Sequence, residues 1–291
     1  MRMNFKWQTS LLSNLRHVLG AALCVGAACG SSAVADRLPR VVSINTCTDQ
    51  LVLALADPAQ IAGLSRFSRN PEMAYLATQA RSFPSLRGTA EEVLRLAPDV
   101  VLAGAYSGRA TREVLAAHRV RVETFAPPVT IAEARAEIER AARLLGQKVR
   151  GHRLVASIDS AVERAELASR SRPTMSALAL ARRGFVSGPD TLLAAALAVN
   201  GLENAARLLG IRSIGQVSLE AIVKLAPYAL VVEGTSEAPD QATAFLHHPV
   251  LERAFPLRRR IALPVPEITC GGPSLAPLIE RIAARSAELP R

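Results

Sequence analysis

Apolar and polar positions follow the same pattern in two distant stretches of the chain. Residues 89–104 read TAEEVLRLAPDVVLAG, and residues 218–234 read SLEAIVKLAPYALVVEG. In each stretch a hydroxyl residue precedes apolar positions at helical spacing, and a proline then ends the helical pattern. The apolar run after the proline has the length and β-branching of a buried parallel strand. Both stretches therefore predict a short capped helix followed by a strand.

The offset between the two copies, about 129 residues, is too long for a solenoid repeat and suits two domains of one kind. Glu91 and Glu220 occupy the first turn of the two predicted helices, where the helix dipole favours an acidic residue. The dipole would explain one such residue. Its recurrence at the same distance from the proline favours a pair of anchors for a symmetric partner.

Between the two copies, residues 130–169 keep a helical spacing of apolar positions, with charged residues on the other face. Gly146 and Gly151 weaken this pattern without ending it. We expect one long helix here, straight or kinked near Gly151. The sequence therefore predicts an α/β fold with an N-terminal lobe over residues 36–128, an interlobe helix over residues 129–170 and a C-terminal lobe over residues 171–291.

The first 35 residues have the pattern of a secretory signal peptide. Basic residues come first, an apolar run covers residues 18–29, and Ala33-Val34-Ala35 forms a small-residue cleavage site. The run is too short to span a bilayer. Plain cleavage before Asp36 is favoured over a lipid anchor on Cys24 or Cys29, which stays the alternative. We therefore expect an exported, soluble mature chain.

The net charge of +10 comes mostly from arginines that are spread along helices among Glu and Ala, and aromatic residues make up only 4% of the chain. A nucleic-acid surface would need a basic stripe with stacking rings, so no nucleic-acid partner is expected. The chain has no GxGxxG, Walker, HExxH or GxSxG motif, and His247-His248 lacks metal-ligand spacing. We expect no cofactor, no metal site and no catalysis. An exported enzyme that uses paired histidines or Cys47 stays the alternative, and a structural or adhesive role is a further rival.

Several segments resemble the class III periplasmic solute-binding proteins of ABC importers, a family that takes up cobalamin, haem and ferric siderophores. The resemblance covers about residues 40–285 and rests on both repeat copies, the long helical stretch and the segments RVVSINTCTDQL, GPDTLL and HPVLERAFPLRRRIALP. It implies two Rossmann-like lobes with the ligand in the cleft between them. It also implies a periplasmic, monomeric protein whose Glu91 and Glu220 dock on arginines of a membrane permease that works with an ATPase.

Polar and aromatic residues gather in five loops at predicted strand ends, where ligands bind open α/β sheets. Arginine forks suit carboxylates, and rings suit a macrocycle or a catechol face. The chain is therefore expected to bind an iron chelate or a corrinoid-like ligand, and the sequence leaves the choice open. The predicted ligand-binding residues are Asn45, Thr46, Cys47, Arg66, Arg69, Tyr75, Tyr106, Arg109, Phe185, Glu267 and Thr269.

Cys47 and Cys270 each follow a predicted strand end, one in each lobe. An oxidising compartment favours a disulfide between them, provided that their Cα atoms come within about 7 Å. The alternative is two separate thiols, one of which contacts the iron or cobalt of the ligand.

Overall fold

The computed structural model describes residues 37–106, 108–234 and 243–290. Residues 38–291 form one compact unit. The predicted signal peptide and most of the loop predicted after Gly234 lie outside the described residues. Among the helices that the structure describes, none combines the length and apolar character needed to cross a bilayer.

The first lobe is built on a five-stranded, all-parallel sheet with the order β3-β2-β1-β4-β5. Every residue of β1, β2 and β4 is buried, as expected for parallel strands that are covered on both faces. The strands are β1 (Val41–Ser43), β2 (Ile61–Ser65), β3 (Ser85–Leu86), β4 (Val100–Gly104) and β5 (Val122–Phe125). The helices are α1 (Thr46–Leu55), α2 (Ala77–Ala80), α3 (Ala90–Arg95) and α4 (Arg109–Ala117), with 3-10 turns at Pro58–Gln60 and Arg66–Arg69.

The second lobe is built on a mixed six-stranded sheet with the order β11-β10-β6-β7-β9, and β8 pairs with β6. Strand β7 runs antiparallel to both β6 and β9, and the other pairs are parallel. The strands are β6 (Met175–Leu180), β7 (Phe185–Ser187), β8 (Leu202–Asn204), β9 (Ile214–Gln216), β10 (Ala229–Glu233) and β11 (Arg260–Leu263). The helices are α7 (Leu192–Ala198), α8 (Leu219–Leu225), α9 (Pro249–Ala254), α10 (Val265–Ile268) and α11 (Leu275–Ala287), with 3-10 turns at Arg182–Gly184, Ala205–Leu209 and Leu257–Arg259.

The two repeat copies form α3 with β4 and α8 with β10, which confirms the predicted helix–strand units. Thr89 and Ser218 cap the helices by accepting backbone N–H bonds from Glu92 and Ala221. Each helix ends at an alanine with positive φ, 43° at Ala97 and 48° at Ala226, directly before the proline. The prolines thus follow a left-handed turn that already redirects the chain into the strand.

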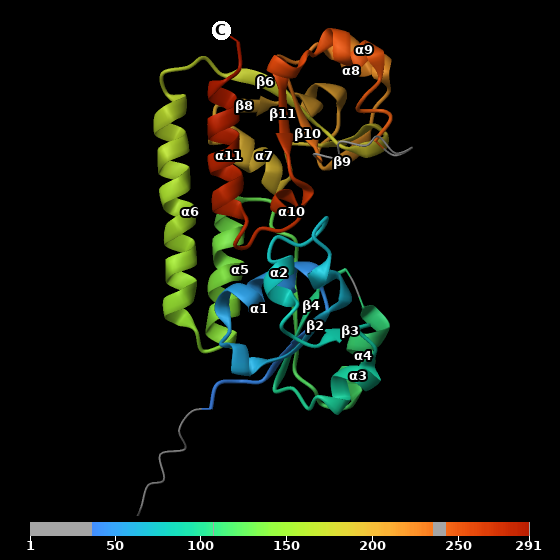
Figure 1. Cartoon of the computed structure of the whole chain (residues 1–291), viewed down its shortest axis with the longest axis vertical. Helices are drawn as coiled ribbons and strands as arrows, with labels where there is room; N and C mark the ends of the chain where they lie inside the picture. The colour runs from blue at the N-terminus through green and yellow to red at the C-terminus, as the bar shows by residue number, and fades with distance from the viewer. Residues whose placement is uncertain (1–36, 107, 235–242, 291) are drawn as a thin grey trace, which may run out of the picture. The chain divides into compact units, whose positions relative to one another are not determined.

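The prediction of one continuous helix over residues 130–169 is wrong, because the chain forms two helices there. Helix α5 (Ile131–Leu144) and the 22-residue α6 (Lys148–Ser169) pack side by side (Figure 1). Gly146 has φ +70°, a conformation that ends a helix at little cost for glycine. Gly151 does not kink α6. A Cβ on it would overlap the Cβ of Ala142 in α5, so this glycine permits the close approach of the two helices.

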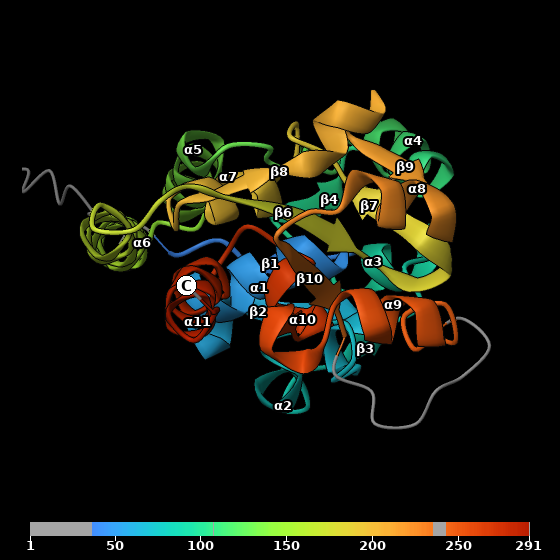
Figure 2. The same cartoon turned by 90° about the horizontal axis from the view of Figure 1, so that it is seen from above.

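Helices α5, α6 and α11 share one hydrophobic cluster with residues of both sheets. Figure 2, viewed from above, shows these three helices together at one side of the sheets. Helix α6 leads from the first lobe to β6, the first strand of the second lobe, and packs along α11. The two predicted lobes and a long connecting helix are therefore confirmed.

Candidate ligand-binding cleft

The second lobe has a hollow of about 520 Å³ where β6 and β10 end at their carboxyl termini. Ligands of open α/β sheets bind at this edge, because loops from several parallel strands converge there. The hollow is lined by Ala181, Arg182, Arg183, Phe185, Val186, Ser187, Ile214, Glu233 and Val265. It combines two cations and one acid with an otherwise mostly apolar wall.

Arg182 and Arg183 lie on the 3-10 turn between β6 and β7, and both are exposed. Arg183 has φ +56°, an unusual backbone conformation for a residue with a side chain. Gln216 donates a 2.7 Å hydrogen bond to the Arg183 carbonyl oxygen, which fixes the turn. Among the residues that the structure describes, neither guanidinium forms an ion pair. Both are therefore available to an anionic ligand.

Glu233 is the last residue of β10 and lines the same hollow. Ser187 donates a 3.0 Å hydrogen bond to its Oε1. Burial raises the pKa of Glu233, and the Ser187 hydrogen bond offsets part of that shift. The sequence analysis missed this residue. The repeat could have revealed it. When the two copies are aligned, Glu233 stands in the second where the first has Gly104, so an acidic group follows the apolar run in one copy alone.

Of the residues predicted to bind ligand, Phe185 lines the hollow and is 43% exposed. In the first lobe, Tyr75 is 37% exposed and Tyr106 is 87% exposed. Arg66 is exposed, with its guanidinium carbon 4.8 Å from the centroid of the Phe67 ring. These side chains keep surface that a ligand can contact.

Other predicted residues use their polar groups to hold local structure. The Asn45 side chain caps α1 by accepting hydrogen bonds from the N–H groups of Cys47 and Thr48, and the adjacent Thr46 is buried. Arg69 donates to the Phe83 carbonyl oxygen. Arg109 pairs with Glu113 at 2.8 Å within α4. The structure does not bring these groups into the hollow.

Glu267 is buried, and both of its carboxylate oxygens accept 2.6 Å hydrogen bonds from Arg281 of α11. This fork raises the pKa of Arg281. A weaker electrostatic contribution to this shift comes from Tyr75 of the first lobe, which therefore lies within electrostatic range of Arg281. Thr269 Oγ1 donates a 2.7 Å hydrogen bond to the Val265 carbonyl oxygen. Glu267 thus positions Arg281 and has no free oxygen for a ligand.

Cys47 and Cys270 form a disulfide with their Cα atoms 5.2 Å apart. It joins the first turn of α1, in the first lobe, to the segment between α10 and α11, in the second. Gly271 follows directly, and a Cβ there would overlap Pro128 and Leu192. The two lobes are therefore joined here by a covalent bond and by van der Waals contacts.

Glu91 and Glu220 are both exposed, in the first turns of α3 and α8. The neighbouring Glu92 instead accepts hydrogen bonds from the N–H groups of Arg87 and Gly88. A hydrogen bond from the Ser218 side chain is the main reason why the pKa of Glu220 is lowered. Glu91 and Glu220 are thus the equivalent acidic groups that the two copies present to solvent.

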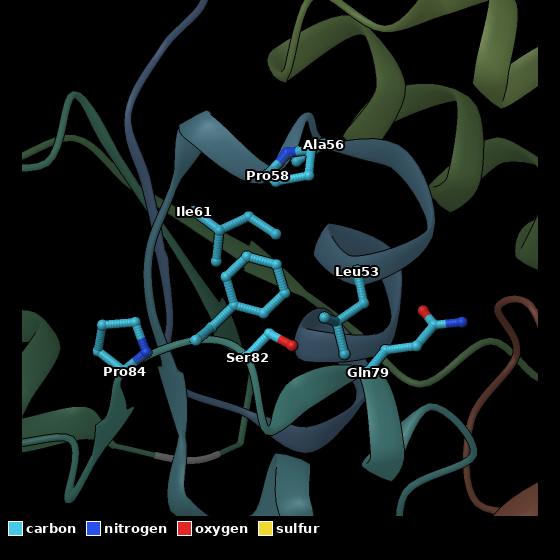
Figure 3. Close-up of a pocket in the computed structure, with 8 residues that line it drawn as sticks. Leu53, Ala56, Pro58, Ile61, Gln79, Ser82 and Pro84 are labelled. Carbon is cyan, nitrogen blue, oxygen red and sulfur yellow. The ribbon is translucent and has the colours of Figure 1, made fainter.

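A second hollow, of about 660 Å³, lies in the first lobe (Figure 3). It is lined mainly by apolar residues around the end of α1 and the amino end of β2, among them Leu53, Ile61 and Phe83. Among the described residues that line it, none is charged. This hollow lies at the amino end of β2, whereas the predicted ligand-binding loops follow the carboxyl ends of the strands.

A family model described as "Periplasmic binding protein" matches residues 41–254. The chain belongs to this family. Membership of this family confirms the predicted relationship to the solute-binding proteins of ABC importers. It implies a periplasmic location and an ABC permease as partner. It also places the chain among binding proteins. A search of curated proteins found no match.

Solved structures of the same fold cover nearly the whole described chain. The periplasmic haem-binding protein RhuT from Roseiflexus sp. RS-1, in its apo form, is 25% identical with a TM-score of 0.69, and the match covers 86% of this chain and 98% of that one. A periplasmic haem-binding protein from Pseudomonas aeruginosa is 24% identical with a TM-score of 0.69, covering 85% and 92%. A possible iron-binding, periplasmic solute-binding protein from Staphylococcus epidermidis is 15% identical with a TM-score of 0.70, covering 86% and 99%.

Proposed function

We propose that this protein captures ferric haem, or a closely related iron tetrapyrrole, and delivers it to an ABC permease. The observation that carries the proposal is the hollow lined by Phe185 and by two arginines that form no ion pair with any residue described in the structure. Haem carries two carboxylates on a flat apolar ring. Arginine forks bind carboxylates, and an aromatic face packs against a macrocycle.

Tyr75 is the candidate ligand of the iron. Its position relative to the hollow is given by helix α10. Val265 of α10 lines the hollow, Glu267 of the same helix holds Arg281, and Tyr75 lies within electrostatic range of Arg281. A tyrosine oxygen is an established ligand of ferric haem. The haem-binding relatives support this ligand class over the siderophore and corrinoid classes.

A titration of the purified mature protein with hemin, followed by absorbance, tests the proposal. We expect a dissociation constant of about 1 μM or lower and a haem spectrum typical of tyrosine ligation. Tyr75→Phe should change that spectrum and weaken binding at least about tenfold, or about 1.4 kcal/mol. Tyr228→Phe is the matched control, because the Tyr228 hydroxyl donates to the Pro290 carbonyl oxygen outside the hollow.

Tight binding of a ferric siderophore or a corrinoid without a response to hemin would overturn the ligand class. The enzyme alternative predicts turnover. Recovery of unaltered haem after prolonged incubation with the protein, in the presence and absence of a reductant, would exclude degradation of this ligand.

We also propose that Glu91 and Glu220 dock on arginines of the permease. The support is their equivalent position on two exposed helix starts, one in each lobe. Two separated carboxylates can engage two guanidinium groups and fix the orientation of the complex.

A further inference from the structure

Glu233 is an acid in a hollow that otherwise suits an anion. Within the described part of the chain its carboxyl group receives one hydrogen bond, from Ser187, and forms no ion pair. Arg182 and Arg183 line the same hollow but are not paired with it. Glu233 is therefore neither a counter-ion for these arginines nor a group fixed by structural hydrogen bonds on both oxygens.

The groups around Glu233 come from several elements. The 3-10 turn contributes Arg182 and Arg183, and β7 contributes the Ser187 hydroxyl. Ala181, which directly follows β6, and Ile214 of β9 are uncharged. Helix α10 contributes Val265, while its acidic residue, Glu267, is held by Arg281. No carboxylate from these elements competes with Glu233 for the hollow.

An ionised Glu233 would repel a ligand carboxylate held by the two arginines. A neutral Glu233 would instead donate an O–H···O hydrogen bond to it, and bonds of this charge-assisted kind are short and strong. Removal from water favours the neutral acid, so burial makes Glu233 easier to protonate than an exposed carboxylate. Two carboxyl groups that share one proton are a stable arrangement in a site shielded from water.

We propose that Glu233, as the neutral acid, donates a hydrogen bond to a carboxylate of the bound ligand, so that this residue takes up a proton on ligand capture. One proton from solvent joins the Glu233 carboxylate when the ligand carboxylate arrives, and it returns to solvent on release. A Tyr75 hydroxyl that ligates the iron releases its own proton, so the Glu233 proton is measured as the difference between the parent and Glu233→Gln. The ligand class is a dianionic tetrapyrrole or another polycarboxylate, and the inference rests on the proposed function because it requires a ligand with carboxylates.

Hemin binding to the full mature protein should be measured at pH 6 and pH 8, by absorbance and by calorimetry in two buffers of different ionisation enthalpy. Relative to Glu233→Gln, we expect the affinity of the parent to fall about tenfold or more from pH 6 to pH 8, with close to one additional proton taken up near pH 8. Glu233→Gln keeps the shape and the Ser187 contact and carries a permanent donor. This variant should lose the proton uptake and bind at pH 8 at least as tightly as the parent.

Three comparisons make the outcome specific. Glu203→Gln, an exposed β8 residue paired with Arg207, should keep the parental pH profile. Ser187→Ala removes a hydrogen bond that favours ionised Glu233, so the pH at which hemin affinity changes should be higher in this variant. This measurement tests the role of Glu233 even if Glu233→Gln fails to fold. The dimethyl ester of the same iron porphyrin, which lacks carboxylates, should bind without proton uptake.

The possible failures are distinguishable. A parent protein that does not bind hemin would overturn the proposed function. A parent that binds hemin with the same pH profile and proton count as Glu233→Gln would overturn the role of Glu233 and leave the proposed function in place. An unchanged transition in Ser187→Ala would contradict that role in the same way.

Discussion

At the residue scale, the polar groups at the strand ends differ in what surrounds them. Asp49 of α1 is fully buried and accepts hydrogen bonds from the Ser65 N–H, at 3.1 Å, and from its hydroxyl, at 2.5 Å. Burial nevertheless raises its pKa from the ordinary 3.8 to about 7, because the hydrogen bonds offset only part of the lost hydration. Asp49 is thus an acid that the folded chain prefers to keep neutral.

Asp49 makes stability depend on pH in a defined direction. Between pH 4 and 7 the unfolded chain loses the Asp49 proton while the folded chain retains it, so its stabilising effect is present below pH 4 and is lost as pH rises to about 7. Asp49→Asn should remove this dependence. We expect urea unfolding to show that the variant gains stability relative to the parent from pH 5 to pH 8, by up to about 3 kcal/mol.

Asp57→Asn is the control for this prediction. Hydrogen bonds from Gln147 and Arg150 lower the pKa of Asp57, so its contribution to stability is lost only at pH values below the ordinary 3.8. In this variant the free energy of unfolding should depend on pH between 5 and 8 as it does in the parent. If the free energy of unfolding changed with pH equally in the parent and in Asp49→Asn, the raised pKa of Asp49 would be contradicted.

At the scale of elements, the contact between α5 and α6 depends on one position where the helices are closest. Gly151 lies against Ala142, and a methyl group there has no room. Alanine has a helix propensity about 1 kcal/mol better than glycine, but overpacking costs about 1–3 kcal/mol. The overlap at Gly151 is with a Cβ atom on a neighbouring helix backbone, so we expect the steric term to dominate.

Gly151→Ala should therefore lower the free energy of unfolding by about 1–2 kcal/mol, measured by chemical denaturation. The double variant Gly151→Ala with Ala142→Gly moves the methyl group to the other helix and should recover most of the loss. His152→Ala, at the exposed neighbouring position, is the control and should stay within about 0.5 kcal/mol of the parent. A stabilised Gly151→Ala variant would show that the helices separate at little cost.

At the scale of the whole molecule, the disulfide links positions 223 residues apart and ties the two lobes together beside the cleft. The loop-entropy estimate for so long a loop is about 5 kcal/mol, and measured effects are usually smaller. We expect the Cys47→Ser and Cys270→Ser double variant to be less stable by about 2–5 kcal/mol. Calorimetry with and without a reductant gives the check, because the reductant should destabilise the parent and leave the double variant unchanged.

The proposed docking on the permease also concerns the whole molecule, because it uses one acidic anchor from each lobe. Glu91→Arg and Glu220→Arg should each leave hemin affinity within about twofold, or 0.5 kcal/mol, since neither residue lines the hollow. Transport into vesicles with the reconstituted importer should collapse. Glu163→Arg makes the same charge change on an exposed position of α6 and should transport normally. Normal transport by the double Arg variant would exclude this docking mode.

The sequence by itself determined the local units of this protein. A hydroxyl cap, helical apolar spacing, a Leu-Ala-Pro stop and an apolar run specify a helix and a buried strand wherever they occur, and their recurrence specified two lobes. The prediction of helix over residues 130–169 was correct except at Gly146. The turn there could not be seen in the sequence, because the apolar spacing continues across it. Cysteine placement left bridge and free thiols as alternatives, and the structure has the bridge.

Only the tertiary structure decided which polar side chains remain free at the cleft. Glu267 is neutralised by Arg281, which is 14 residues further along the chain, and the Asn45 side chain is used as a helix cap. Arg182 and Glu233 reach one hollow because β6 and β10 are neighbours in the sheet, although they are far apart in sequence. Partners of this kind are set by packing between distant segments, and a local pattern of residue types carries no information about them.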